Sequence, residues 1–259
     1  MKHGASQVDL AMQVLRVIEG RNDLGVGARE LVAEIGVSKS SLQRVLVSLD
    51  AGDLLSCDRD GKYRLNHRVL ALAHTFSRST DFHALVTPAM QRLEAQVHET
   101  VVLSVESNRS RVTIAQCESL HELRYRTDLG RSYPLWGGAS GWLLAYAGAS
   151  ELIEGTVDKF EDSLRERGIG SDEERRTRAK ELRQEIEISG ERGWALSRGT
   201  WAPGGFGLSV PLRMRVDRSN AALTVYGPEA RVGKERYMDI LDRLKSTGEE
   251  IDSILAIRQ

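Results

Sequence analysis

Two apolar helical stripes joined by a short break constrain the fold of this chain more than any other feature. Apolar residues recur at the i, i+3, i+4 and i+7 spacing of one helix face from Ala28 to Ile35, and again from Leu42 to Leu49. Between the stripes, Gly36 can end the first helix in the left-handed conformation, and the Ser38 hydroxyl can cap the second. The pattern therefore predicts a helix, a tight turn and a second helix.

The residues on either side extend this unit to a winged helix-turn-helix. An apolar stripe from Val8 to Glu19 predicts a preceding helix. Runs at 54–57 and 62–65 flank the turn 58–61, in which Gly61 can supply a positive φ, so they predict a hairpin. We expect residues 1–66 to form one domain, with the hairpin as its wing.

The solvent-facing side of the second helix is suited to DNA. It carries small polar side chains and cations, and no acid occurs between Ser38 and Leu49. Such a helix fits the major groove, where Gln43 can pair with adenine and Arg44 with guanine or a phosphate. The remaining cations and hydroxyls suit phosphate contacts. The candidate DNA-binding residues are Ser38, Lys39, Ser40, Ser41, Gln43, Arg44, Lys62 and Arg64.

The whole-chain charge limits how DNA could be bound. The net charge is -1 at pH 7, so no global basic field exists and any DNA site must be local. Winged helices also serve as dimerisation or protein-binding modules. A ligand-sensing adaptor that uses its winged helix for protein contacts therefore stands as the alternative.

Length and composition restrict the rest of the chain. With 259 residues it is expected to hold two domains. No apolar run reaches the ~18 residues of a membrane helix, and no signal segment is recognisable, so we expect a cytoplasmic protein without membrane contact. Cys57 and Cys117 stand apart, and the six histidines form no H-E-x-x-H pair. Neither a metal site nor a cofactor is expected.

Several segments resemble the IclR family of bacterial transcription regulators, in the family's order and over nearly the whole chain. They are L-V-A-E-I-G-V-S-K-S-S-L-Q-R-V-L at 31–46, G-D-L-L at 52–55, G-K-Y-R-L at 61–65, T-D-L-G-R-S-Y-P-L at 127–135 and P-E-A-R at 228–231. The resemblance implies a winged helix joined by a linker helix to a GAF-like effector-binding domain. It also implies a dimer or tetramer on palindromic double-stranded operator DNA, with repression relieved by a small-molecule effector.

In this scheme residues 67–80 are the linker helix and residues 81–259 the effector-binding domain. Asn66 can serve as the N-cap of the linker, and the apolar residues from Leu70 to Phe76 offer surface for a partner. The alternative is an ordinary helix within one domain.

Beyond the linker, helical and strand patterns alternate. Helical spacing occurs at Phe82–Val97, Ser140–Tyr146, Asp172–Ile188 and Lys234–Ile257. Strand-forming runs occur at Thr100–Ser107, Val112–Cys117, Phe206–Leu212 and Ala221–Tyr226. The alternation predicts an α+β domain in which helices flank one sheet.

A glycine-rich segment and four tryptophans indicate the effector site. Small residues at 137–141 precede a helix whose free amides can hold an anion, although a turn that only packs helix on sheet is the alternative. All four tryptophans lie in the C-terminal region. Trp136 and Trp142 stand where relatives often have His and Lys. The family's usual acidic position is taken by Ser197, Arg198 or Thr200, and Arg198 adds a partner for an anion. These features favour an aromatic carboxylate, while core packing of the indoles is the alternative.

The resemblance also places the far wall of the site on the closing strands, with hydroxyls that can orient a ligand. The candidate effector-binding residues are Trp136, Gly138, Ala139, Ser140, Trp142, Arg198, Trp201, Ser209, Thr224 and Tyr226.

Catalysis is not expected. The segment from Gly138 to Trp142 approaches the G-x-S-x-G nucleophile elbow but lacks its last glycine. No P-loop or G-x-G-x-x-G motif follows a predicted strand. The prediction is a DNA-binding transcription regulator, more specifically a repressor, whose operator affinity is controlled by an effector.

Overall fold

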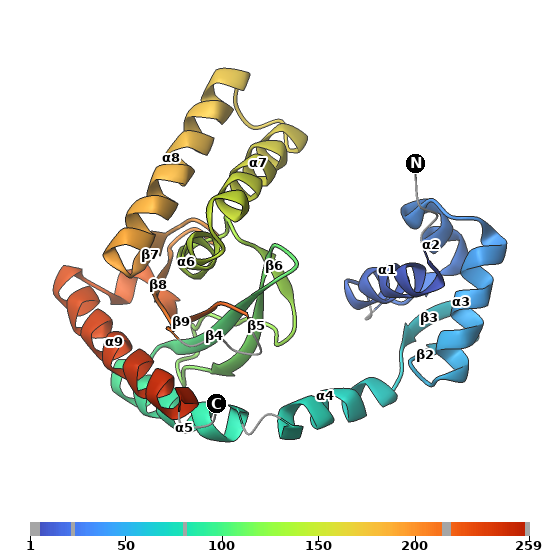
Figure 1. Ribbon diagram of the computed structural model, residues 1–259, viewed down its shortest axis with the longest axis horizontal. Coiled ribbons are helices and arrows are strands. Elements are labelled where there is room, and N and C mark those ends of the chain that lie inside the picture. Colours follow the sequence, from blue (N-terminus) through green and yellow to red (C-terminus); the bar gives the residue numbers. More distant parts are fainter. Residues whose placement is uncertain (1–5, 22–23, 80–81, 214–218, 257–259) are drawn as a thin grey trace. The chain divides into compact units, whose positions relative to one another are not determined.

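The chain divides into two compact units, Met1–Thr80 and Asp81–Gln259 (Figure 1). The computed structural model describes residues 6–21, 24–79, 82–213 and 219–256. The start of the expected first domain, the linker's last residue Thr80 and the expected helix end at Ile257 lie outside these ranges.

The N-terminal unit has the elements of a winged helix-turn-helix. They are α1 (Gln7–Glu19), β1 (Val26–Gly27), α2 (Ala28–Ile35), α3 (Lys39–Ala51), β2 (Leu55–Cys57), β3 (Lys62–Leu65) and α4 (Arg68–Ser79). β2 and β3 form the expected antiparallel hairpin. β1 was not expected; it pairs with β3, so that the sheet order is β1-β3-β2.

Local signals set the turn between α2 and α3 as predicted. Gly36 has a φ of 73° and its amide donates to the Val32 carbonyl, which ends α2. The Ser38 hydroxyl accepts from the Ser41 amide at 3.2 Å and caps α3. The apolar stripes of α1, α2 and α3 meet in one core that includes the fully buried Leu31 and Leu42.

The C-terminal unit is α+β, as expected. Its helices are α5 (Phe82–Val97), α6 (Ala139–Ala147), α7 (Ser150–Glu166), α8 (Asp172–Arg192), the short 3-10 helix Glu229–Arg231 and α9 (Lys234–Ala256). Its strands are β4 (Thr100–Ser107), β5 (Ser110–Cys117), β6 (Ser132–Pro134), β7 (Ala195–Arg198), β8 (Gly205–Pro211) and β9 (Ala221–Pro228). They form one antiparallel sheet in the order β6-β5-β4-β9-β8-β7.

The sequence-based prediction missed α7, β6 and β7. The signal for α7 was present, because Leu152, Ile153 and Val157 form a buried stripe along it. β6 and β7 have only three and four residues, too short for a clear alternating pattern.

Helices cover both faces of the sheet (Figure 1). α5 and α9 pack on one face, where Leu103, Leu208 and Leu223 belong to a large apolar core. α6 packs on the other face, with α7 and α8 against it. Because neighbouring strand residues point to opposite faces, the strands present a different set of side chains to α6.

Candidate functional site

The outer face of α3 presents the candidate base contacts. Lys39, Ser40, Gln43 and Arg44 are all exposed. The buried residues of α3, which pack in the core with α1 and α2, are Leu42, Val45, Leu46 and Leu49. Val47, one turn further along, is 57% exposed. This face therefore offers amide, guanidinium and methyl groups, the types that read base edges in the major groove.

The serines at the start of α3 contact one another. The Ser38 hydroxyl lies 2.9 Å from that of Ser41 and 3.1 Å from that of Ser40. Ser38 and Ser41 are therefore engaged in the cap itself. Lys39 extends from the same turn, where the positive end of the helix dipole favours an anion such as phosphate.

The wing cations are held more closely to the protein than Lys39 and Arg44. Lys62 Nζ lies 3.4 Å from the Leu24 carbonyl oxygen, and Arg64 Nη2 lies 3.2 Å from the same oxygen. Arg64 also pairs with Asp58 at 3.5 Å. Both cations join the wing to the segment before β1, and both side chains are half-buried.

The wing turn is organised by Asp58. Its Oδ1 accepts the backbone amides of Lys62 at 2.9 Å and Asp60 at 3.0 Å. The hydrogen bond from the Lys62 amide, with that from Asp60 and the nearby Arg64, lowers the pKa of Asp58 below its usual 3.8. Gly61 completes the turn with a φ of 76°.

In the C-terminal unit, the sheet face under α6 is polar although it is buried. The buried polar side chains of β4, β5, β7, β8, β9 and α6 are Thr100, Ser104, Arg111, Thr113, Ser140, Ser197, Ser209 and Thr224. Buried polar groups carry a cost unless they are hydrogen-bonded, and a few convergent polar groups are what orients a ligand, so this layer is a candidate binding surface.

A small cavity lies at one side of this layer. Its volume is about 20 Å³, and its lining includes Tyr125, Gly137, Ser197, Trp201 and Tyr226. A space of this size holds about one water molecule. Of the candidates chosen from the sequence, Trp201 and Tyr226 line it.

Trp201, which lines the cavity, contacts further aromatic side chains. Trp201 is 44% exposed, and its ring centroid lies 5.6 Å from that of Tyr133 and 6.0 Å from that of Trp136. A methyl group added at Gly137 would come within 2.9 Å of the Trp201 ring. The segment that carries Trp201 follows Gly199 and precedes Gly204, both at positive φ.

The lining of the cavity does not include Trp142, Ser209 or Thr224. Trp142 is buried in the core between α6, α7 and α8, and its indole nitrogen donates to the Trp136 carbonyl at 3.2 Å. The Ser209 and Thr224 hydroxyls bond to each other at 2.6 Å. The contacts of Trp142 agree with the alternative that this indole packs in the core.

The glycine-rich start of α6 is a close approach of helix to sheet. Gly138 is the N-cap residue with a φ of 113°, and an added methyl group would lie 3.2 Å from the Ser197 hydroxyl. Ala139 and Ser140 follow in the buried first turn. Arg198 points away from this region: its side chain is 50% exposed, pairs with Glu229 and lies over the Tyr237 ring.

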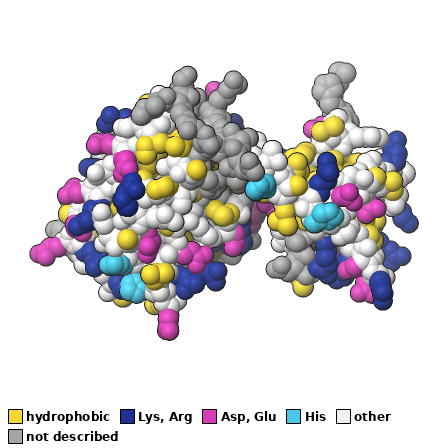
Figure 2. Space-filling model, turned by 90° about the horizontal axis from the view of Figure 1, so that it is seen from below, with side chains coloured by type: hydrophobic (Ala, Val, Ile, Leu, Met, Phe, Trp, Pro, Cys, Tyr) yellow, Lys and Arg dark blue, Asp and Glu magenta, His cyan; other side chains and the backbone are white. Residues whose placement is uncertain are grey.

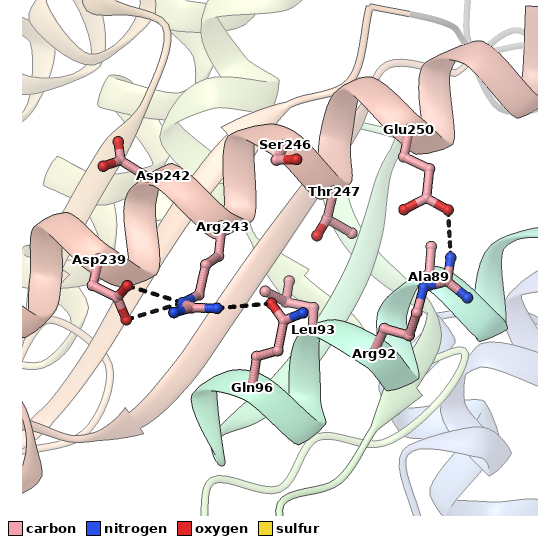
Figure 3. A pocket seen from close by; sticks show the side chains of 10 residues that line it. All are labelled: Ala89, Arg92, Leu93, Gln96, Asp239, Asp242, Arg243, Ser246, Thr247 and Glu250. Carbon is pink, nitrogen blue, oxygen red and sulfur yellow. Dashed lines mark hydrogen bonds and ion pairs between the residues drawn. The ribbon is translucent and has the colours of Figure 1, made fainter.

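A wider groove between α5 and α9, of about 410 Å³, is occupied by its own ion pairs (Figure 3). Arg92 pairs with Glu250 across the groove. Arg243 contacts Asp239 at 2.9 Å and Gln96 at 3.1 Å. These side chains satisfy one another and join the two helices, so we assign no ligand to the groove.

Comparison with known proteins decides the family. The profile of the family described as "Bacterial transcriptional regulator IclR C-terminal" matches residues 74–253, more than half of the chain. The chain belongs to the IclR family.

Its relatives are regulators of transcription. The "HTH-type transcriptional regulator KipR" of Bacillus subtilis (strain 168) is 25% identical over 222 residues, which are 86% of each chain. The "HTH-type transcriptional repressor AllR" of Escherichia coli (strain K12) is 21% identical over 256 residues, 98% of this chain and 92% of that protein. The crystal structure of an IclR homologue complexed with 4-hydroxybenzoate, from Microbacterium hydrocarbonoxydans, aligns with a TM-score of 0.72 at 19% identity and covers 97% of this chain and 100% of that one.

As a member of the IclR family, the chain is a DNA-binding transcription regulator and not an enzyme, as predicted. Within the described ranges, no helix is long and apolar enough to cross a membrane. Likewise, no cluster of three or more His, Cys, Asp or Glu side chains in those ranges could hold a metal ion. On the face shown in Figure 2, cationic and anionic side chains are interspersed, in keeping with a net charge of -1.

The candidate effector-binding residues chosen from the sequence did not include Arg111, Tyr125 and Ser197. Arg111 and Ser197 are buried on the polar face, and Tyr125 lines the cavity. A signal for Arg111 was available: it alternates along β5 with Val112, so it lies on the same face as Thr113. The sequence pattern did not reveal that this polar face of the sheet points into the protein interior.

Proposed function

We propose that this IclR-family regulator is a cytoplasmic repressor whose operator affinity is set by a small aromatic carboxylate bound between α6 and the polar face of the sheet. The observation that carries the proposal is the buried polar layer beside a cavity lined by Trp201 and Tyr226. The name of AllR supports repression, and the 4-hydroxybenzoate complex supports an aromatic acid.

On the DNA side, α3 enters the major groove with Gln43 and Arg44 toward the bases. Lys39 and the half-buried Lys62 and Arg64 contact phosphates. A homodimer or tetramer then reads a palindromic operator, because two copies of α3 face two half-sites. The exposed Leu70 and Leu72 on α4 offer apolar surface for the second copy.

On the effector side, binding requires movement. Ligand pockets for small molecules have volumes of ~300 Å³ or more, whereas the cavity here measures about 20 Å³. An aromatic acid therefore enters only when Trp201 and the segment between Gly199 and Gly204 move outward. Binding thus selects a different arrangement of the effector domain, and that arrangement changes operator affinity. By thermodynamic linkage, operator DNA changes effector affinity by the same factor.

The DNA function is tested with Arg44→Ala. Loss of a base or phosphate contact should weaken operator binding by about 1–3 kcal/mol. Arg165→Ala is the matched control, since Arg165 is an exposed arginine on α7 that pairs with Asp162. An adaptor that contacts only protein predicts equal operator binding by both variants. Electrophoretic mobility shift at several salt concentrations distinguishes the two functions.

The effector function is tested by titrating the protein with 4-hydroxybenzoate while tryptophan emission is recorded, and then repeating the operator titration at saturation. A saturable change in emission together with a shift in operator affinity supports the proposal. Binding without any shift in operator affinity contradicts control by this compound.

A further inference from the structure

Arg111 is a buried cation on the polar face of the sheet. It lies on β5, and the residue is 2% exposed. Its Nη1 donates to the Ser140 hydroxyl at 2.9 Å and to the Tyr226 hydroxyl. Its Nε is buried and has no acceptor among the described residues. A guanidinium has five N–H donors, so these two hydroxyls leave part of its capacity unused.

No carboxylate in the described ranges forms an ion pair with Arg111. A different arginine in the same unit shows the usual arrangement: Arg231 contacts both oxygens of the buried Glu99 at 2.7 Å. Arg111 instead lies among aromatic rings, 5.0 Å from the Tyr133 centroid and 5.8 Å from the Tyr226 centroid.

The nearby Tyr125 does not supply the missing negative charge. Burial raises the pKa of Tyr125 to about 12, with the nearby Tyr226 contributing and Arg111 opposing, so Tyr125 is neutral at physiological pH. Cation–π contacts offset part of the desolvation of a guanidinium, but a buried charge normally requires a counter-charge as well. An anion that bound here would satisfy both the charge and the open Nε.

This cation adjoins the cavity. Tyr226, whose hydroxyl Arg111 contacts, lines the cavity, and its ring stacks on Tyr125 at a centroid distance of 4.4 Å. Ser140 lies in the first turn of α6, directly after Gly138 and Ala139. The guanidinium, the Ser140 hydroxyl and the start of α6 thus converge at the inner side of the two tyrosines.

We propose that Arg111 binds the anionic group of the effector, as a buried anion site that the Ser140 and Tyr226 hydroxyls help to orient. The inference rests on the proposed effector control and specifies its ligand class: a monocarboxylate or a similar small anion whose apolar part faces Tyr125 and Trp201. The carboxylate accepts from Nε and Nη2, the side of the guanidinium that Glu99 occupies on Arg231, and so pairs two oxygens with the planar group. Nη1 keeps the Ser140 and Tyr226 hydroxyls.

The test is isothermal titration of the full chain with benzoate, phenylacetate and butyrate, each compared with its neutral amide. The variants are Arg111→Met, Arg111→Lys and Arg198→Met, with Arg165→Met as the matched surface control. Methionine removes the charge and keeps an unbranched apolar chain, an exchange that buried ion sites often tolerate.

For the wild type, we expect at least one acid to bind roughly 10- to 150-fold more tightly than its amide, the range of one to two charge-assisted hydrogen bonds. Arg111→Met should lower the affinity for the acid to that for the amide and leave the amide unchanged. Arg198→Met and Arg165→Met should retain the preference. If Arg111→Met does not fold, Arg111→Lys decides, because it keeps the charge without the planar fork and should weaken acid binding alone.

Three results would overturn the anion site: no acid binds the wild type, amides bind as tightly as acids, or the Arg111 variants keep the full preference for acids. Failure of effector control would give a different result from failure of the anion site. An acid that binds through Arg111 but leaves operator affinity unchanged supports the anion site and contradicts control by that ligand.

Discussion

Arg111 Nη1 and the Ser140 hydroxyl lie 2.9 Å apart, although 29 positions separate the two residues in the chain. The contact ties β5 to the first turn of α6, and α6 in turn packs against β8 and α8. In the proposed anion site, a ligand held by Arg111 would therefore act on α6 through Ser140. The proposed effector site would thus have a physical path from one buried charge to the helices that cover the sheet.

The cap of α3 should contribute measurably to the stability of the N-terminal unit. Ser38→Ala removes the hydroxyl that accepts from the Ser41 amide, which should cost about 1 kcal/mol. All four tryptophans lie beyond residue 130, so their fluorescence reports on the C-terminal unit. Urea unfolding should show a lower midpoint by circular dichroism and an unchanged one by fluorescence.

Ser171→Ala is the matched control for this experiment, because Ser171 caps α8 in the same way, through the Glu174 amide. It should lower the fluorescence midpoint. Equal midpoints for Ser38→Ala and wild type would contradict the role of Ser38 as a cap.

Gly137→Ala should displace Trp201. The added methyl group would approach the indole to 2.9 Å and the Pro134 carbonyl to 3.1 Å, which is overpacking of a kind that costs about 1–3 kcal/mol. We expect greater quenching of tryptophan emission by acrylamide, and no such increase in a Gly137→Ala/Trp201→Phe double variant. Gly233→Ala is the control, since a methyl group there meets nothing within 4 Å. Identical quenching of Gly137→Ala and wild type would argue against the packing of Trp201 on Gly137.

The Glu99–Arg231 pair should stabilise the C-terminal unit. The Glu99 side chain is 1% exposed, so Arg231→Met leaves a buried carboxylate without its cation and should cost about 3 kcal/mol in unfolding free energy. Glu99→Gln combined with Arg231→Met should recover part of this loss. Arg243→Met, which breaks an exposed pair with Asp239, should cost less than about 1 kcal/mol. Urea unfolding measures these free energies. Equal losses of unfolding free energy for Arg231→Met and Arg243→Met would show that the burial of Glu99 does not matter.

The wing should depend on pH through Asp58. Its pKa is lowered in the folded state, chiefly by the Lys62 amide, so its stabilising effect is present above pH 3.8 and is lost as pH falls through the folded value. Asp58→Asn keeps an oxygen acceptor but not the charge. The difference in circular-dichroism midpoint between wild type and Asp58→Asn should be largest above pH 4 and shrink below it. A difference independent of pH would mean that the charge of Asp58 is not involved.

The helix-turn-helix was predictable because its signals are local. The i, i+3, i+4 pattern, the left-handed Gly36 and the Ser38 cap each depend on residues within one or two turns. The capping box of Ser171 and Glu174 at the start of α8 is likewise a local signal, since it lies within one turn. The short β1, β6 and β7 were not predictable, because two to four residues carry no usable period and their pairing depends on distant strands.

The sequence by itself determined the winged helix-turn-helix, the α+β character of the second unit and, through motif resemblance, the family. Only the tertiary structure decided which side chains share the polar face. Arg111 lies beside Tyr226, 115 positions away, because β5, β4 and β9 are neighbours in the sheet, and beside Ser140 because α6 covers that sheet. Arg198, chosen for its charge, is turned outward to Glu229 and Tyr237. Local patterns set each element, but strand order and the burial of charge set the site.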